Sequence, residues 1–460
     1  MRRRDVVRGL PALAFAACAE DRTYAPSRVV ASADWPGLGD ADSALFPTGV
    51  QSGEARFDSL LVWTQYTGEA TLEVVVVVWA DGAWVEHATV SAPLDPDHEV
   101  AGTTHTPVTG LPPDAPVAYQ FRDADGALSQ VGHSRTAAPA ESARTVRFGA
   151  TSCCSAQGAP FPSLVNVAAR GDLDFFVWNG DTVYQDSADN TAQMRSIWTR
   201  NLRTEGFRAI MERTPGVFTW DDHEVDNDWG IPGLISPARE QLGTDVFFEF
   251  ACVARDPDVP ARLWRTFRFG CVEVIVLDGR SEHDIDAEEY LSEAQFAWFK
   301  DALITSDATW KLVINSVPIA QMPDAYNIQQ LKYEHWNGYP AQRAELIEHI
   351  TSNAITGVMF LSGDFHHPGL YRVDAEGPGN ALLDFLVGPA GSSLNALGRV
   401  IMDGEQYVWS DAAHNSARFE LRPEGLGHVV WVTDEDIAIA EAWFDVHGTI
   451  NFLDWVPPPP

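Results

Sequence analysis

Hydrophobic residues occur in short runs of strand length through the first third of the chain. The runs at 59–66 (SLLVWTQY), 71–80 (TLEVVVVVWA), 103–111 (TTHTPVTGL) and 117–123 (VAYQFRD) contain many β-branched and aromatic residues, and Gly, Pro and Asp separate them. Runs of this kind predict strands joined by turns. We therefore expect an all-β sandwich, similar to a fibronectin type III module, over residues 27–140.

The pattern changes after the linker-like stretch TAAPAESAR. Apolar runs that end in polar residues now alternate with helix-like segments at 294–303 and 340–350. These runs lie at 146–154, 173–181, 271–280, 310–320 and 357–365. Alternating strands and helices predict an α/β catalytic domain over residues 145–455, with its site at the strand ends. We expect these strand ends to belong to one sheet and to meet at one edge.

Composition and charge narrow the possible partners. The chain has 460 residues, 65 of them acidic and 31 basic, which gives a formal charge of −34. So acidic a surface repels nucleic acid at long range, and we expect no nucleic acid as a stable partner. Phosphate esters remain possible ligands because bound metal ions can reverse the local charge.

The N-terminus has the features of an export signal over residues 1–18. Four arginines lie among the first eight residues, and an apolar run from Gly9 to Ala17 precedes Cys18. The arginine cluster resembles a twin-arginine signal, and FAAC resembles a lipoprotein cleavage site. We expect an exported protein, periplasmic or at the cell surface, with membrane attachment through lipidated Cys18. The alternative is cleavage near Ala19 without a lipid.

The remaining cysteines are Cys153, Cys154, Cys252 and Cys271. In an oxidising compartment Cys252 and Cys271 could form a disulfide or remain free, and sequence alone leaves both outcomes open. Adjacent cysteines rarely bond to each other, so Cys153 and Cys154 need another explanation.

Chemically reactive side chains directly follow the predicted strands. The stretch TWDDHEVDND holds His223 among five carboxylates. The other residues at strand ends are Cys153, Asp181, Tyr184, Arg280, Asp364, His366 and His367. Each has an ordinary explanation by itself, such as a turn, a solvated loop or a core cysteine. A single site explains all of them together, and we predict one.

These residue types suit two different metal ions. Ferric iron prefers hard anionic ligands and tolerates thiolate and imidazole, whereas calcium prefers oxygen. The predicted iron ligands are Cys153, Asp181, Tyr184 and His366, and the predicted ligands of the second ion are Asp222, Asp364 and the shared Asp181. Two such ions would hold a hydroxide for attack on phosphorus, and His223 would protonate the leaving alkoxide.

The ordered motifs ATSC, NGDTVYQ, TWDDHEVDNDW, LDGRS and LSGDFHH resemble those of the alkaline phosphatase D (PhoD-type) branch of the calcineurin-like metallophosphatases. The resemblance implies a four-layer α/β/β/α sandwich behind an N-terminal β-sandwich. It also implies one ferric iron, one or two calcium ions, and hydrolysis of phosphomonoesters and phosphodiesters outside the cytoplasm. Arg280 matches an arginine expected to hold phosphate, and we predict Asn227 as a further substrate-binding residue.

Two alternative functions remain open at this point. The first is a phosphodiesterase specific for phospholipid or a cell-wall polymer. The second is a calcium-dependent surface binding protein whose α/β domain is a relic. That second function predicts missing ligands, yet all six predicted metal ligands are present.

Overall fold

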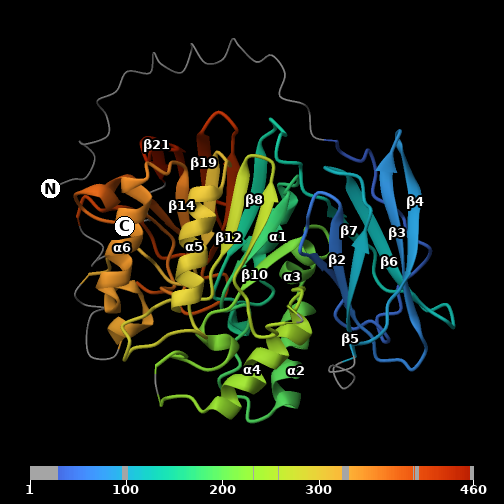
Figure 1. Cartoon of the computed structure of the whole chain (residues 1–460). Helices are drawn as coiled ribbons and strands as arrows, with labels where there is room; N and C mark the ends of the chain where they lie inside the picture. The colour runs from blue at the N-terminus through green and yellow to red at the C-terminus, as the bar shows by residue number, and fades with distance from the viewer. Residues whose placement is uncertain are drawn as a thin grey trace.

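The computed structural model describes residues 29–455, except 96–101, 232, 257, 324–330, 397 and 399–403. The predicted export signal, including Cys18, lies outside the described residues. Two sheets stand face to face in the centre of the molecule, with helices on both outer sides and the N-terminal strands beside them (Figure 1). This arrangement confirms the expected four-layer α/β/β/α architecture with an all-β N-terminal region.

Ten strands form the larger of the two central sheets. Their order is β21 (Ile450–Trp455), β20 (Ala438–Asp445), β19 (Leu426–Thr433), β18 (Asn415–Leu421), β8 (Val146–Thr151), β9 (Phe175–Asn179), β10 (Gly216–Thr219), β1 (Val50–Gly53), β2 (Ser59–Gln65) and β5 (Thr103–Thr109). The seven-stranded sheet has the order β11 (Arg265–Phe269), β12 (Val272–Val276), β13 (Trp310–Ile314), β14 (Val358–Ser362), β16 (Leu383–Leu386), β15 (Gly369–Arg372) and β17 (Tyr407–Ser410).

Helices cover the outer face of each central sheet. The ten-stranded sheet packs against α1 (Pro162–Ala169), α2 (Thr191–Leu202), α3 (Glu205–Met211) and α4 (Pro237–Phe250). The seven-stranded sheet packs against α5 (Glu293–Thr305) and α6 (Pro340–Ser352). No helix among the described residues combines the length and hydrophobicity needed to cross a membrane.

Successive side chains along one strand point to opposite faces of its sheet, and this explains how each central sheet packs on both sides. In β9, Phe175 faces the space between the sheets, where its ring lies 4.4 Å from that of Phe269. Trp178, three residues further along the same strand, faces the helices, and its ring lies 4.7 Å from that of Phe207 in α3. Since successive strand residues point to opposite faces, a strand buried on both faces must be almost wholly apolar. The runs that predicted these strands have that composition.

The N-terminal sandwich shares a sheet with the catalytic part of the chain. One of its sheets has the order β4 (Ala83–Ser91), β3 (Leu72–Ala80), β6 (Pro116–Asp123) and β7 (Gly132–Arg135). The facing strands β1, β2 and β5 continue the ten-stranded sheet, because β1 pairs with β10 in parallel at Gly53 and Gly216. The two regions therefore form one continuous structure, a feature that the linker-like composition did not predict.

The described cysteines are free thiols in buried positions. Cys252 lies against the carbonyl of Leu61, and Cys271 lies against that of Leu421. The disulfide that the sequence left open is therefore not formed.

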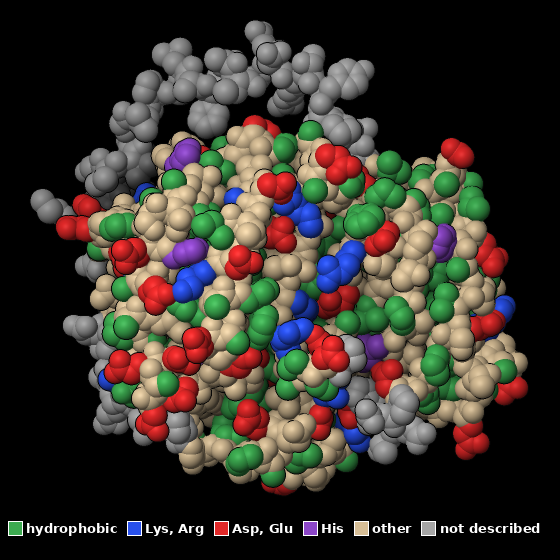
Figure 2. Space-filling view, viewed as in Figure 1, with side chains coloured by type: hydrophobic (Ala, Val, Ile, Leu, Met, Phe, Trp, Pro, Cys, Tyr) green, Lys and Arg blue, Asp and Glu red, His purple; other side chains and the backbone are tan. Residues whose placement is uncertain are grey.

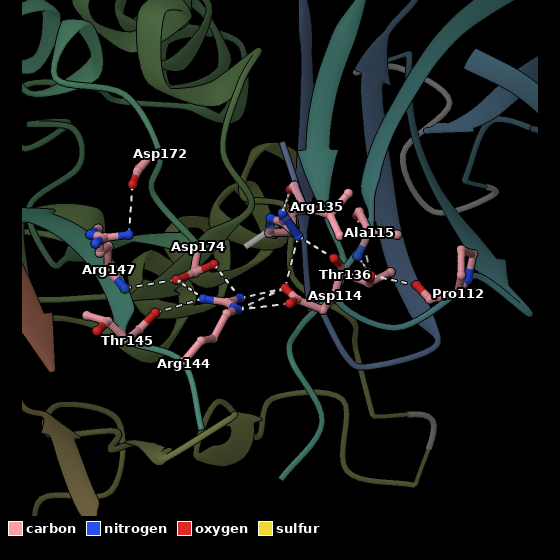
Figure 3. A network of polar contacts seen from close by, with 11 residues as sticks. Pro112, Asp114, Ala115, Arg135, Thr136, Arg144, Thr145, Arg147, Asp172 and Asp174 are labelled. Carbon is pink, nitrogen blue, oxygen red and sulfur yellow. Dashed lines mark hydrogen bonds and ion pairs between the residues drawn. The ribbon is translucent and has the colours of Figure 1, made fainter. Parts of the chain in front are cut away.

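A buried ion-pair network joins the N-terminal sandwich to the catalytic region (Figure 3). Arg144, whose side chain is 4% exposed, lies 2.7 Å from an oxygen of Asp114 and 2.7 Å from one of Asp174. Asp114 lies between β5 and β6, whereas Asp174 directly precedes β9. Arg135 of β7 also contacts Asp114 at 2.9 Å. One guanidinium thus holds carboxylates from both regions.

Replacing Arg144 with methionine should lower the free energy of unfolding by about 3–5 kcal/mol, because Asp174 would remain buried without its cation. Urea unfolding followed by tryptophan fluorescence measures this change. The matched control is Arg170→Met, since the Arg170–Asp436 pair is 36% and 60% exposed. That substitution should cost less than about 1 kcal/mol. Equal costs for both variants would contradict the joining role of Arg144.

Candidate active site

The strand ends meet at the junction of the two central sheets. Strands β8, β9 and β10 of the larger sheet lead into Cys153, Asp181 and the short helix η4 (Asp222–Glu224). Strands β12 and β14 of the smaller sheet lead into Arg280 and Asp364. We expected these ends in a single sheet. The structure divides them between two facing sheets, so the site is enclosed from both sides.

Four predicted metal ligands have left-handed backbone conformations. The φ angles are 55° at Cys153, 53° at Asp181, 64° at Asp364 and 54° at His366. Residues other than glycine rarely adopt such angles, and strained backbone of this kind concentrates at functional sites. The residues with this strained backbone are thus the ones whose ligand atoms lie close together.

The first ligand group contains a thiol, a carboxylate, an imidazole and a phenol. Ligand atoms of Cys153, Asp181 and His366 lie within 4.8 Å of one another. The Tyr184 hydroxyl donates a hydrogen bond of 2.8 Å to Asp181 and lies 3.0 Å from Nε2 of His366. Burial raises the pKa of the Cys153 thiol well above its ordinary value, and the Asp181 carboxylate adds to this effect. A bound cation would reverse that effect and favour the thiolate.

The second ligand group consists of carboxylates. Oxygen atoms of Asp181, Asp221, Asp222 and Asp364 lie within 4.8 Å of one another. Burial raises the pKa of Asp364 well above its ordinary value, and the charges of Asp221 and Asp222 raise it further. Oδ1 of Asp222 is buried and accepts no hydrogen bond from the described residues. Crowded carboxylates with an unpaired oxygen fit an oxygen-coordinated cation, and Asp181 belongs to both groups.

His223 lies beside Asp181 with its ring held from two sides. Its Nδ1 is 2.6 Å from Oδ1 of Asp186, and its ring centroid is 3.9 Å from that of Tyr184. Burial alone would lower the pKa of His223, but Asp181, Asp186 and Asp222 together raise it to about 11. Cations on Asp181 and Asp222 would cancel part of this effect, whereas the contribution of Asp186 would remain. Asp186 thus favours the protonated form of the imidazole.

Glu224, another acidic residue of TWDDHEVDND, braces the site. Glu224 accepts hydrogen bonds from the backbone N–H groups of Asp181 and Asp221 at 2.9 and 2.8 Å, and another from that of Thr182. This carboxylate therefore fixes two ligand loops against each other. Asp226 lies at the surface, 3.3 Å from Arg239.

Arg280 is buried behind the site. Its side chain is 1% exposed and forms ion pairs with Asp221 and Glu334. Its Nη2 atom is buried without a hydrogen-bond partner among the described residues. Its carboxylate partners surround the guanidinium, and the direct phosphate contact that we expected of Arg280 stays a prediction. In this structure Arg280 fixes Asp221 and Glu334 and places a positive charge behind the aspartates.

A pocket of about 410 Å³ opens onto the carboxylates. Asp222, His223, Asp364 and His366 line it, and so does Asn227, whose role in substrate binding stays a prediction. Its walls also include residues that our sequence analysis did not select, among them Asp228, Glu334 and the apolar Leu394. Oxygen atoms of Asp222, Asp228 and Glu334 form a further group within 4.8 Å.

Comparison with known proteins identifies the family. The family model described as PhoD-like phosphatase matches residues 148–425, and the model of its N-terminal domain matches residues 32–138. The chain belongs to the PhoD-like phosphatase family. Alkaline phosphatase D of Bacillus subtilis (strain 168) is 25% identical over 379 residues, which cover 70% of this chain and 64% of that protein. The chain therefore aligns with slightly less than two thirds of this PhoD-like relative.

Solved structures share the fold. A structure titled as that of PhoD superposes with a TM-score of 0.79 at 20% identity, covering 92% of this chain and 94% of the other. The purple acid phosphatase PPD1 from yellow lupin seeds has a TM-score of 0.64 at 14% identity, covering 85% and 73% of the two chains. At these identities the likeness concerns the fold alone. The chain has this fold, and the clustered thiol, imidazole and carboxylate groups at its strand ends are suited to binding metal ions.

The sequence analysis did not select Glu334 or Asp186, two residues that lie at the site. Glu334 lies in the short helix η6 (Leu331–Glu334), far from any strand end in sequence. Asp186, by contrast, follows Asp181 by five residues in the same loop. Its position close to Asp181, a predicted ligand of both metals, could have marked Asp186 as a residue of the site. Its pairing with His223 depends on how that loop folds back onto η4.

Replacing Asp186 with asparagine should move the basic limb of the pH–rate profile to lower pH, by roughly one pH unit. The carboxylate stabilises protonated His223, so its loss lowers the pKa of the imidazole. A general acid loses activity as pH rises through its pKa. The measurement is kcat/KM for an alkyl phosphate across the alkaline range. A nitrophenyl ester is the control, because its leaving group needs little protonation. A uniform loss of rate at every pH would show a structural role only.

Proposed function

We propose that this protein is an exported, metal-dependent phosphoesterase that hydrolyses phosphomonoesters, phosphodiesters or both. The observation that carries the proposal is the position of Asp181, which belongs to a thiol–imidazole group and to a carboxylate group at once. One carboxylate shared between two dissimilar ligand groups suits a pair of unlike metal ions. His223 lines the same pocket and would supply the acid for the leaving oxygen, because the neighbouring carboxylates raise its pKa.

The proposed metals are one ferric iron and one or two calcium ions. Cys153, Asp181, Tyr184 and His366 would hold the iron, while Asp181, Asp222 and Asp364 would hold a calcium ion. When bound, the metal pair would supply an activated water and offset the charge of the phosphate. Asp228 and Glu334 would provide further oxygen ligands beside Asp222.

The protein's own groups would orient the substrate and move one proton. Asp186 holds Nδ1 of His223, which leaves Nε2 to protonate the leaving oxygen from the pocket side. Asn227 lines the pocket and could contact a phosphate oxygen. Arg280 would act through Asp221 and Glu334, whose orientation it fixes.

The proposed location is the periplasm or the cell surface, with attachment to the membrane through lipidated Cys18. The arginine-rich start and the apolar run before Cys18 support export. The acidic composition disfavours nucleic acid as a stable partner. Metal ions in the site would reverse the local charge and so admit small or polymeric phosphate esters as substrates. Figure 2 illustrates how acidic side chains are spread over one face of the molecule.

Replacing Asp181 with asparagine should abolish hydrolysis and reduce the content of both metals, because a shared ligand is lost from two groups. Elemental analysis of protein purified without chelator, together with hydrolysis of a monoester and a diester, measures both effects. The control is Asp226→Asn, which changes a carboxylate of the acid-rich stretch outside the ligand groups. It should keep the metals and the rate. Unchanged metal content in Asp181→Asn would contradict the shared role, and inactive metal-loaded wild type would overturn the proposed function.

A further inference from the structure

A second hollow adjoins the catalytic pocket. It has a volume of about 460 Å³, and its walls include Ser155, Gln157, Tyr184, Asp186, Ser187 and Arg200. The first pocket is lined mainly by acidic and imidazole groups, whereas this hollow offers hydroxyls, an amide and a guanidinium. The two cavities therefore suit different parts of a ligand.

A group of three side chains separates the two cavities. His223 lines the catalytic pocket, while its partners Tyr184 and Asp186 line the second hollow. The rings of His223 and Tyr184 are 3.9 Å apart, and Nδ1 of His223 lies 2.6 Å from Asp186. The leaving oxygen must lie beside His223 to receive its proton. A leaving group that continues past this wall would enter the second hollow.

Arg200 is the cation of this hollow. It is exposed on α2, and no hydrogen bond, ion pair or ring contact joins its side chain to another described residue. Neighbouring arginines are occupied: Arg195 pairs with Glu249, and Arg239 binds the backbone carbonyls of Gln185 and Ala188. The hollow also contains the carboxylate of Asp186, whose Oδ1 lies 2.6 Å from Nδ1 of His223. Arg200 is therefore the lining group of this hollow that carries a positive charge and is open to an anion.

We propose that this hollow binds a second phosphate, carried by the leaving group of the substrate, and that Arg200 is a specificity-determining residue. This inference rests on the proposed phosphoesterase function and deepens it. Arg200 would form charge-assisted hydrogen bonds to the second phosphate, and the hydroxyls of Ser155 and Ser187 and the amide of Gln157 would add neutral donors.

The test compares two substrates that differ only in the second phosphate, n-propyl phosphate and propane-1,3-diol bisphosphate. Each is offered with the reacting phosphate free and as its methyl ester. Wild-type protein should favour the bisphosphate, and Arg200→Gln should lower kcat/KM for it by about 10- to 100-fold. The same variant should change kcat/KM for the propyl compounds by less than about 2-fold. Arg200→Lys should recover part of the preference.

The matched control is Arg203→Gln, which removes an exposed cation at the end of the same helix but outside the hollow. It should affect both substrates alike, as long-range attraction alone would. The inference is overturned if Arg200→Gln behaves like Arg203→Gln, or if wild type does not distinguish the two substrates. If metal-loaded wild type hydrolyses neither, the proposed function fails. Calorimetric binding of the same two compounds to wild type and Arg200→Gln then decides the inference separately.

Discussion

Mutual repulsion among buried carboxylates is the constraint on which this structure depends. Oxygen atoms of four aspartates lie within 4.8 Å of one another at the junction of two sheets. Such a cluster is costly in a low-dielectric interior unless cations or protons balance it. Arg280 supplies one positive charge from behind, but its guanidinium is already shared between Asp221 and Glu334. The remaining negative charge makes the site an attractive position for metal ions.

The fold holds this cluster in place by several independent contacts. The two sheets deliver the ligand loops from opposite sides, and left-handed turns at Asp181 and Asp364 direct the carboxylates inward. Glu224 ties two of these loops together through backbone N–H groups. The N-terminal sandwich extends the sheet that carries Cys153 and Asp181, and Arg144 fastens it to the segment before β9. Packing far from the pocket therefore limits movement of the ligands.

Much of this arrangement could be predicted from the sequence, because apolar runs that end in reactive residues are a local signal. The strands β8, β9, β12, β13 and β14 and the helices α5 and α6 all occupy predicted segments. The order of the strands within each sheet could not be predicted in this way. Which ends share a sheet depends on pairing between segments distant in sequence, so the division into two sheets was not predicted from the pattern of runs. The continuation of the larger sheet into the N-terminal strands was missed for the same reason.

The site was predictable to the extent that its residues follow strands. Cys153, Asp181, Tyr184, Asp364 and His366 meet as expected. Glu334 was not predicted because a long-range contact brings its helix to the pocket. The burial of Arg280 and the free thiols of Cys252 and Cys271 likewise depend on packing that no local pattern encodes.

The dependence of the site on cations is tested most directly by thermal unfolding of Asp364→Asn against wild type, at pH 8, with chelator and with bound metals. The pKa of Asp364 is raised in the folded state. The ionised carboxylate therefore destabilises the metal-free protein as pH rises through that value. In chelator the variant should be more stable than wild type, by about 1–3 kcal/mol. With metals the order should reverse, because a ligand is missing. A variant less stable than wild type in both conditions would contradict the account.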